Sequence, residues 1–213
     1  MILEQLTVGQ MAVCCYLVAD PETKEAMVID PGGDEGRVLD LIKARGVKLK
    51  YIVNTHGHPD HVCGNRRLKE ATGAAIIMPR ADAEFFLRPE VANYFSMLGL
   101  EASPVPDILI DDNDTISLGA LEFKVILTPG HTPGGVCLYR APDLFTGDTL
   151  FVGGVGRTDF PGGNARLMQE AIDKRLLTLP DETRVWPGHG YGGLSSTIGE
   201  EKKSNPFITG GIF

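Results

Sequence analysis

The segment Thr55–His61, Thr-His-Gly-His-Pro-Asp-His, constrains this chain most, because it places four potential metal ligands within six residues. The four are His56, His58, Asp60 and His61. The segment follows the apolar run Tyr51–Val53, which predicts a short buried strand, and precedes a helical pattern that begins at Asn65. The ligands therefore lie on a loop at the carboxyl end of a strand, where open α/β sheets keep their sites. The first two can point the same way and the last two can face a neighbouring position, so we expect ligands for two adjacent metal ions.

Two further loops carry the remaining histidines of the chain, which has five in all. His131 lies in Thr-Pro-Gly-His-Thr-Pro-Gly and His189 lies in Trp-Pro-Gly-His-Gly, each after an apolar run. Glycine and proline fix unusual backbone angles, which suits loops that aim an imidazole inward. Asp148, in Leu-Phe-Thr-Gly-Asp-Thr, follows another strand-like run and is a further candidate ligand.

Length and composition restrict the classes of protein that the rest of the chain allows. The 213 residues fit one large domain or at most two small ones, and 43% hydrophobic residues suffice for a substantial core. The net charge of -8 argues against a nucleic-acid-binding surface, which would be basic. The sequence has no run of 18 or more apolar residues, so we expect no membrane span.

The N-terminus and the cysteines predict a cytoplasmic location. The first lysine is Lys24, so the start of the chain lacks the basic region of a signal peptide. The four cysteines are Cys14, Cys15, Cys63 and Cys137, and no Cys-x-x-Cys spacing occurs among them. Cys14 and Cys15 alternate sides of a predicted strand and do not easily pair. These features indicate reduced thiols.

Hydrophobic periodicity predicts a mixture of strands and helices along the chain. The predicted strands are residues 2–8, 11–19, 26–29, 51–53, 75–78, 116–118, 121–127, 136–139 and 144–145. The predicted helices are residues 38–45, 81–87 and 167–176, the first of them ending at Gly46. Residues 88–106 are either a helical or irregular excursion near the mouth of the site or plain surface packing. The pattern alone shows only mixed α and β structure.

Four motifs in one order resemble the metallo-β-lactamase superfamily and, within it, the short bacterial glyoxalase II-like hydrolases. They are His-x-His-x-Asp-His at 56–61, Pro-Gly-His-Thr-Pro-Gly at 129–134, Thr-Gly-Asp at 146–148 and Pro-Gly-His-Gly at 187–190. The resemblance extends from about Met1 to Phe207, and linked motifs are far more specific than a lone His-x-His. It implies an α/β (α+β) fold, the four-layer αβ/βα sandwich, with the metal site at the sheet edges. It further implies one domain over residues 1–213, without the C-terminal helical region that completes the glutathione site of full-length glyoxalase II.

The candidate ligands can form two metal sites. The first takes His56, His58, His131 and Asp148, and the second takes Asp60, His61, His189 and again Asp148. A carboxylate has two oxygens, so Asp148 can bridge two cations roughly 4 Å apart. Imidazole and carboxylate ligands suit zinc, iron and manganese and disfavour calcium and magnesium. We expect two divalent ions, zinc first, with iron or manganese as alternatives, in sites whose open positions are typical of catalysis.

This ligand set predicts a metal-dependent hydrolase. A water between two divalent ions loses its proton near neutral pH, and the hydroxide attacks a carbonyl carbon. A thioester suits this chemistry, because a thiolate, with a thiol pKa of roughly 8.5, leaves without strong acid assistance. We assign catalytic roles to Asp148 and to Asp60, which would also orient the hydroxide. The resemblance implies hydrolysis of S-lactoylglutathione to lactate and glutathione, a small-molecule thioester.

Two residues match substrate-contacting positions of glyoxalase II. Arg157 takes the place of a basic residue, frequently lysine, that meets glutathione, and Tyr191 matches a tyrosine that also contacts it. The chain departs from the pattern at Asp159, where an aromatic residue is expected, and it stops where the helical glutathione-binding region would begin.

A second reading comes from another reaction class. Gly156–Phe160, Gly-Arg-Thr-Asp-Phe, also resembles the persulfide dioxygenases of the same superfamily. Those enzymes bind one iron through two histidines and one aspartate, here His56, His131 and Asp148, with positions open for O₂. They usually have Pro-Ala-His-Asp at the last histidine, whereas this chain has Pro-Gly-His-Gly-Tyr, which favours the hydrolase. Asp30, at a strand end, either orients a ligand histidine or only forms a turn.

Overall fold

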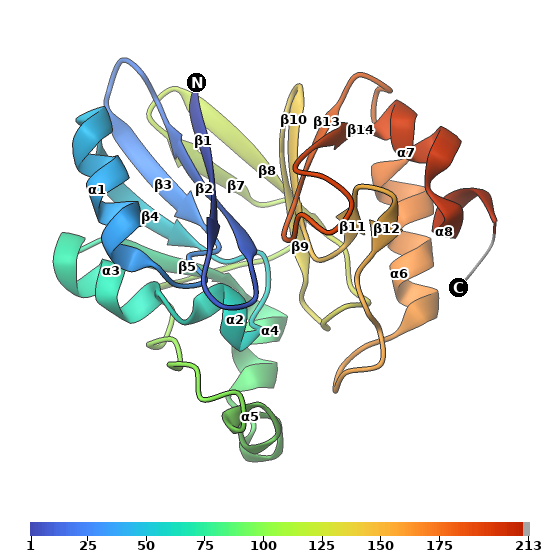
Figure 1. The fold of residues 1–213 in the computed structure, drawn as a ribbon, viewed down its shortest axis with the longest axis horizontal. Helices are drawn as coiled ribbons and strands as arrows, with labels where there is room; N and C mark the ends of the chain where they lie inside the picture. The colour runs from blue at the N-terminus through green and yellow to red at the C-terminus, as the bar shows by residue number, and fades with distance from the viewer. Residues whose placement is uncertain (211–213) are drawn as a thin grey trace.

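Two six-stranded β-sheets pack face to face in the computed structural model, which describes residues 1–210, and helices cover both outer faces (Figure 1). The predicted four-layer αβ/βα sandwich is therefore confirmed. The end of the predicted domain, residues 211–213, lies outside the described residues, and the extent of the domain stays a prediction. Within the described part of the chain, no helix is both long and apolar enough to cross a membrane.

The first sheet comes from the N-terminal half, in the order β1-β2-β3-β4-β5-β6. Neighbouring strands are antiparallel from β1 to β3 and parallel from β3 to β6. The strands are β1 (Ile2–Val8), β2 (Val13–Ala19), β3 (Glu25–Ile29), β4 (Lys48–Val53), β5 (Ala75–Pro79) and β6 (Ile108–Ile110). The helices of this half are α1 (Glu35–Arg45), α2 (Pro59–Val62), α3 (Asn65–Thr72), α4 (Arg80–Phe86) and α5 (Pro89–Ser96). As predicted, the first helix ends at Gly46, whose φ of 60° suits glycine.

The second sheet comes from the C-terminal half, in the order β14-β13-β10-β9-β8-β7. Its strands are β7 (Thr115–Leu118), β8 (Leu121–Leu127), β9 (Val136–Arg140), β10 (Asp143–Gly147), β13 (Arg184–Pro187) and β14 (Ser196–Thr197). A separate ribbon pairs β11 (Leu150–Phe151) with β12 (Gly154–Val155). The helices are α6 (Ala165–Ala171), which continues into the π-helical turn η1 (Ile172–Leu176), then α7 (Ile198–Ser204) and α8 (Pro206–Thr209).

Strand β2 shows why the sheets pack in layers. All seven of its residues are buried, because alternate side chains enter two different cores. Cys14, Tyr16 and Val18 join the cluster between the sheets, whereas Cys15 and Leu17 join the cluster under the outer helices. The two adjacent cysteines thus face opposite sides, as predicted, and all four cysteines are free thiols. A strand with two apolar faces can only lie in the middle of such a sandwich.

The predicted site loops all follow the carboxyl ends of strands. The histidine-rich segment follows β4, and the loops of His131, Asp148 and His189 follow β8, β10 and β13. Strands β10 and β13 are parallel, with Gly147 opposite Pro187, which sets Asp148 beside the last histidine loop. The sheets are also tied together here, because Val136 donates its backbone N–H to the Thr55 carbonyl at 2.9 Å. The topology therefore gathers loops from both sheets at one edge of the sandwich.

Candidate metal centre

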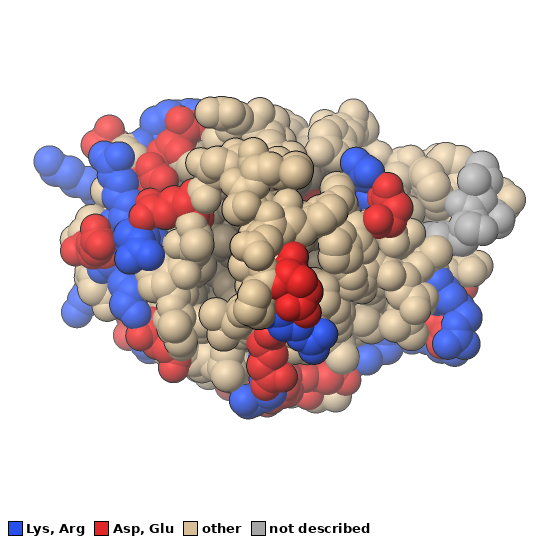
Figure 2. Space-filling view, turned by 90° about the horizontal axis from the view of Figure 1, so that it is seen from below, with Lys and Arg blue, Asp and Glu red and all other residues tan. Residues whose placement is uncertain are grey.

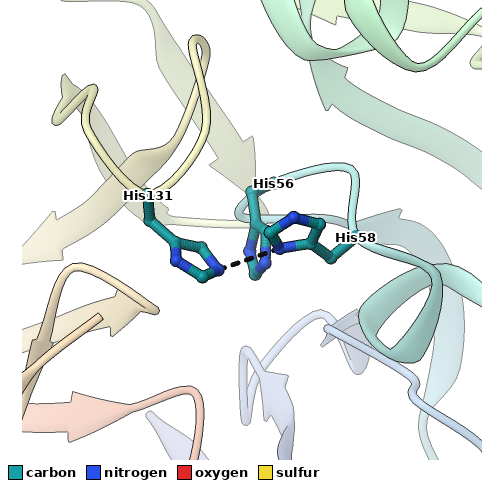
Figure 3. Close-up of side chains that lie close together, drawn as sticks. All are labelled: His56, His58 and His131. Carbon is teal, nitrogen blue, oxygen red and sulfur yellow. Dashed lines mark hydrogen bonds between the residues drawn. The ribbon is translucent and has the colours of Figure 1, made fainter. Parts of the chain in front are cut away.

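His56, His58 and His131 form the first trio of donors. Their metal-binding nitrogens lie within 4.8 Å of one another, and Nδ1 of His58 is 2.8 Å from Nε2 of His131 (Figure 3). The three rings converge on one point between the β4 and β8 loops (Figure 3). Nε2 of His56 is buried without a hydrogen-bond partner. Because an unpartnered buried polar atom is costly, this nitrogen fits a cation between the three rings.

Asp60, His61 and His189 form the second trio, again with donor atoms within 4.8 Å of one another. Nε2 of His61 lies 3.2 Å from Nε2 of His189. The Oδ2 atom of Asp60 lies 3.4 Å from Nε2 of His189 and 3.6 Å from Nε2 of His61. Helix α2 begins at Pro59, and it turns Asp60 and His61 toward this second position beside the first.

Asp148 faces both trios. Its Oδ2 lies 3.4 Å from Nε2 of His131, and its Oδ1 lies 3.5 Å from Nε2 of His61. The Oδ1 atom is buried and has no hydrogen-bond partner. A glycine at position 188 is needed for this placement, because a Cβ there would lie 2.1 Å from that oxygen. The carboxylate thus faces both trios, and the structure brings all seven predicted ligands together.

Three of the five histidines are held by the ring nitrogen that faces away from the trios. The contacts are His56 Nδ1 with Thr55 Oγ1 at 3.1 Å, His61 Nδ1 with Asp30 Oδ2 at 3.1 Å, and His131 Nδ1 with the Arg157 carbonyl at 2.6 Å. Such bonds fix the tautomer and ring orientation of a metal-binding histidine and leave Nε2 for the ion. This arrangement is typical of a metal centre and is not expected of histidines that only fill a core.

Asp30 resolves the choice that its sequence left open. Its Oδ1 accepts the backbone N–H of Thr55 at 2.8 Å, and its Oδ2 accepts the Thr55 hydroxyl at 2.6 Å. The same Oδ2 holds His61. The residue also adopts a φ of 51°, which aspartate tolerates better than most residues. Asp30 therefore turns the chain and orients a candidate ligand at the same time.

The protonation of the first trio suits a cation. Burial, and then the charge of neighbouring histidines, lowers the pKa of His56 well below its usual value. Burial and the neighbouring His131 lower the pKa of His58 to about 3. Both imidazoles are therefore neutral near pH 7, which is the form that binds metal.

Three carboxylates surround His61. Burial alone would lower the pKa of this histidine, but Asp148, Asp60 and Asp30 raise it well above the usual value. Burial raises the pKa of Asp148, but the charges of His61, His131 and His189 outweigh burial and lower it. Bound cations would compensate so much negative charge in a buried site, because an uncompensated buried charge is strongly unfavourable.

A buried residue beside the site that sequence reasoning missed is Asp82, on α4. It is fully buried. Its Oδ2 accepts the backbone N–H of Gly57 and the hydroxyl of Thr132, both at 2.8 Å, and its Oδ1 accepts the backbone N–H of Gly134 at 2.6 Å. Gly57 lies between two candidate ligands and Thr132 follows a third, so one carboxylate joins both loops of the first trio.

The two predicted substrate-binding residues lie at the rim of the centre. Tyr191 is exposed and stacks on the ring of His189, with centroids 4.9 Å apart and an interplanar angle of 6°. The Arg157 side chain is exposed, pairs with Asp159 at 2.7 Å and lies 4.3 Å over the ring of Phe160. Asp159, the departure from the glyoxalase II pattern, thus neutralises the basic residue in this structure.

Residues 88–106 do approach the site. Phe95 on α5 packs against the ring of His58, with centroids 5.1 Å apart, and Phe86 packs on the same ring at 5.3 Å. Beyond Ser96 the segment has no helix or strand until Ile108. Of the two readings of this segment, the excursion near the site is therefore confirmed.

The model of the metallo-β-lactamase superfamily matches residues 8–189. This match includes every candidate ligand, and the chain belongs to this superfamily. The geometry of its buried histidine and aspartate cluster is that of a divalent-metal centre.

The relatives include members of two reaction classes at similar identity. Hydroxyacylglutathione hydrolase GloC of Haemophilus influenzae is 37% identical over 98% of both chains. Human mitochondrial persulfide dioxygenase ETHE1 is 35% identical over 98% of this chain and 76% of its own.

Solved structures confirm the fold. The BLEG-1 B3 metallo-β-lactamase has a TM-score of 0.89 at 30% identity and covers 98% of this chain and 100% of its own. TTHA1623 in a di-iron-bound form has a TM-score of 0.83 at 34% identity and covers 96% of this chain and 99% of its own.

Proposed function

We propose that this protein is a metal-dependent hydrolase that cleaves a thioester such as S-lactoylglutathione into a hydroxy acid and glutathione. The observation that carries the proposal is the position of Asp148, whose carboxylate faces both trios and could therefore contact two cations. The 37% identity with a hydroxyacylglutathione hydrolase supports the substrate class. A small-molecule substrate and a cytoplasmic location belong to the same proposal.

Two cations, zinc first, would supply Lewis acidity and lower the pKa of a water toward neutrality. His56, His58 and His131 would hold one of them, and Asp60, His61 and His189 would hold the other. Asp148 would contribute to both, and its ionised state suits that role. Asp60 lies at the wall of the second trio, where its carboxylate can also accept a hydrogen bond from the attacking nucleophile and so orient it.

The remaining chain groups would bind the thiol half of the substrate. Tyr191 offers an aromatic face and a hydroxyl above His189. Arg157 offers a guanidinium that can exchange its exposed partner Asp159 for a substrate carboxylate, because exposed ion pairs are weak. In this proposal both bind glutathione at the rim, without contact with the reacting carbonyl.

Persulfide dioxygenase activity is the second candidate, because the human enzyme is nearly as similar as the hydrolase. The iron set of that alternative, His56, His131 and Asp148, is also together here, with Asp148 Oδ2 3.4 Å from Nε2 of His131. The second trio is what favours the hydrolase, since one iron would leave Asp60, His61 and His189 without an ion.

One purified sample tests the two activities side by side. Hydrolysis of S-lactoylglutathione and oxygen uptake on glutathione persulfide are assayed on the same protein, with its metals counted. Thioester turnover without oxygen uptake is the expected result. Oxygen uptake with one iron per chain and no thioester turnover would replace the hydrolase with the dioxygenase.

A further inference from the structure

An apolar cavity of about 400 Å³ lies beside the metal centre, between α4, α5 and residues 100–106. Its wall includes Gly57 and Pro59, the two residues that flank His58. Apolar side chains make up most of the remaining wall, among them Met78, Ala83, Phe86, Phe95, Leu100 and Val105. A volume of this size falls in the range of small-molecule sites, which are roughly 300–1,000 Å³.

The lining offers nothing for a charged ligand to bind. Among the described residues of the wall, none is charged and only Ser96 and Ser103 carry a hydroxyl. Both hydroxyls are already engaged: Ser96 donates to the Asn93 carbonyl at 2.7 Å, and Ser103 accepts from Asn65 at 2.8 Å and donates to the Pro104 carbonyl at 2.9 Å. An apolar group is therefore the ligand that this wall suits, because a polar one would lose its hydrogen bonds to water.

The wall reaches the metal centre through two aromatic rings. Phe86 and Phe95 line the cavity and also pack on the ring of His58, at centroid distances of 5.3 and 5.1 Å. A group in the cavity would thus end beside the first trio. Arg157 is outside the lining and lies over Phe160, which in turn packs on Phe95 with centroids 6.1 Å apart. The charged rim and the apolar cavity are therefore neighbouring but separate surfaces.

Part of the wall faces solvent. Leu87 is 67% exposed and Val105 is 72% exposed. Seen from the side on which α5 lies, much of the middle of the molecular surface is uncharged and hollowed, and a small group of acidic and basic side chains lies beside the hollow (Figure 2). Exposed apolar side chains around a hollow commonly mark a ligand site.

We propose that this cavity binds the acyl group of the thioester and that the enzyme prefers acyl groups longer and more apolar than lactoyl. The proposal rests on the proposed thioester hydrolysis and assigns its two substrate halves. The polar thiol half binds at the Arg157 rim, and the acyl half enters the cavity with its carbonyl at the first trio. A water molecule, with one heavy atom, occupies roughly 30 Å³ in the liquid. A lactoyl group has only five heavy atoms and would therefore leave most of this cavity without contact.

A series of glutathione thioesters tests the assignment, with lactoyl, butanoyl, hexanoyl and octanoyl groups on the same thiol. Each buried methylene is expected to raise kcat/KM roughly threefold to fourfold. The variant is Ala92→Trp, which places an indole at an exposed position of the wall on α5. Ala71→Trp, at an exposed position of α3, is the matched control. We expect Ala92→Trp to bring the octanoyl-to-lactoyl ratio of kcat/KM close to one, and Ala71→Trp to keep the wild-type ratio.

Calorimetric titration of the metal-loaded protein with octanoate and butanoate gives a readout that needs no turnover. We expect octanoate to bind at least tenfold more tightly than butanoate, and Ala92→Trp to remove the difference. If lactoylglutathione is hydrolysed but kcat/KM does not rise along the acyl series and the two acids bind equally, the acyl assignment is overturned and the proposed hydrolase stands. If octanoate binds selectively and no thioester is cleaved, the proposed hydrolase fails, and the acyl assignment fails with it.

Discussion

Replacing Asp82 by asparagine tests whether this buried carboxylate positions the first trio. The substitution keeps the shape of the side chain but turns one acceptor oxygen into a donor. Asp82 receives two backbone N–H groups, from Gly57 on one oxygen and Gly134 on the other, so an amide leaves one of them facing a donor. A buried donor without an acceptor costs about 1–3 kcal/mol.

The negative charge of Asp82 is itself unfavourable in the buried site. Removing it offsets the loss of the hydrogen bond, by an amount that depends on pH. Burial raises the pKa of Asp82 from 3.8 to about 6, against hydrogen bonds from Thr132, Gly57 and Gly134 that lower it. At about 1.4 kcal/mol per pKa unit, the ionised carboxylate costs the folded state about 3 kcal/mol near neutral pH. Asparagine avoids that cost, so the net effect of Asp82→Asn on stability near pH 7.5 is small.

Lowering the pH separates the two effects. Because the folded pKa lies above the unfolded one, the folded wild type takes up a proton that the unfolded chain does not, and it gains stability as the pH falls from about 7 toward 4. Between about pH 7.5 and pH 5 this gain is about 1.4 kcal/mol for the wild type and absent for Asp82→Asn. The variant is therefore less stable relative to the wild type at pH 5 than at pH 7.5.

Urea unfolding of chelator-treated protein at both pH values measures this difference without metal binding. Asp40→Asn, at an exposed position of α1, is the matched control and should show no such pH dependence. A chelator competition at pH 7.5 then compares metal affinity, which we expect Asp82→Asn to weaken about tenfold or more. An equal stability difference at both pH values, together with wild-type metal affinity, would refute the positioning role of Asp82.

Three further predictions concern the surroundings of the metals. Asp30→Asn, which changes the carboxylate that holds His61, should weaken metal affinity about tenfold to a hundredfold in a chelator competition, and unchanged affinity would remove Asp30 from the centre. Arg157→Ala should raise the KM for S-lactoylglutathione severalfold with little change in kcat, because an exposed rim residue contributes binding alone. The control Arg166→Ala, at an exposed position of α6, should change neither constant. A large loss of kcat in Arg157→Ala would contradict the rim assignment. Chelation of bound metal should lower the free energy of unfolding by about 4 kcal/mol if free metal had been a thousandfold above its Kd, and a melting temperature that chelation leaves unchanged would count against a buried metal pair.

The clustering of the candidate ligands could be predicted from the sequence because histidine is scarce in this chain and each motif follows an apolar run. His131, for example, lies beyond β8 and meets His58 across the sheet edge, as expected when strand ends converge. The limits of the predicted strands were also close to those observed, although the predicted strand over residues 11–19 begins at Val13, because Ala12 adopts a φ of 55° in the preceding turn.

Asp82 and the apolar cavity were not accessible in the same way. Asp82 lies between two alanines on a short helix, and its partners are 25, 50 and 52 residues away along the chain. No local pattern encodes such contacts. The cavity depends on the path of residues 97–107, which have no helix or strand and therefore no periodicity from which burial can be predicted.

The most direct test of the account is a metal count on the wild type and on Asp148→Asn, with S-lactoylglutathione hydrolysis measured on the same samples. Asp148 faces both trios, so its carboxylate is expected to help hold two cations together. We predict about two metal ions per wild-type chain with thioester turnover, and a loss of metal together with most of the turnover in the variant. One metal ion per wild-type chain, or full turnover by Asp148→Asn, would contradict a two-metal hydrolase.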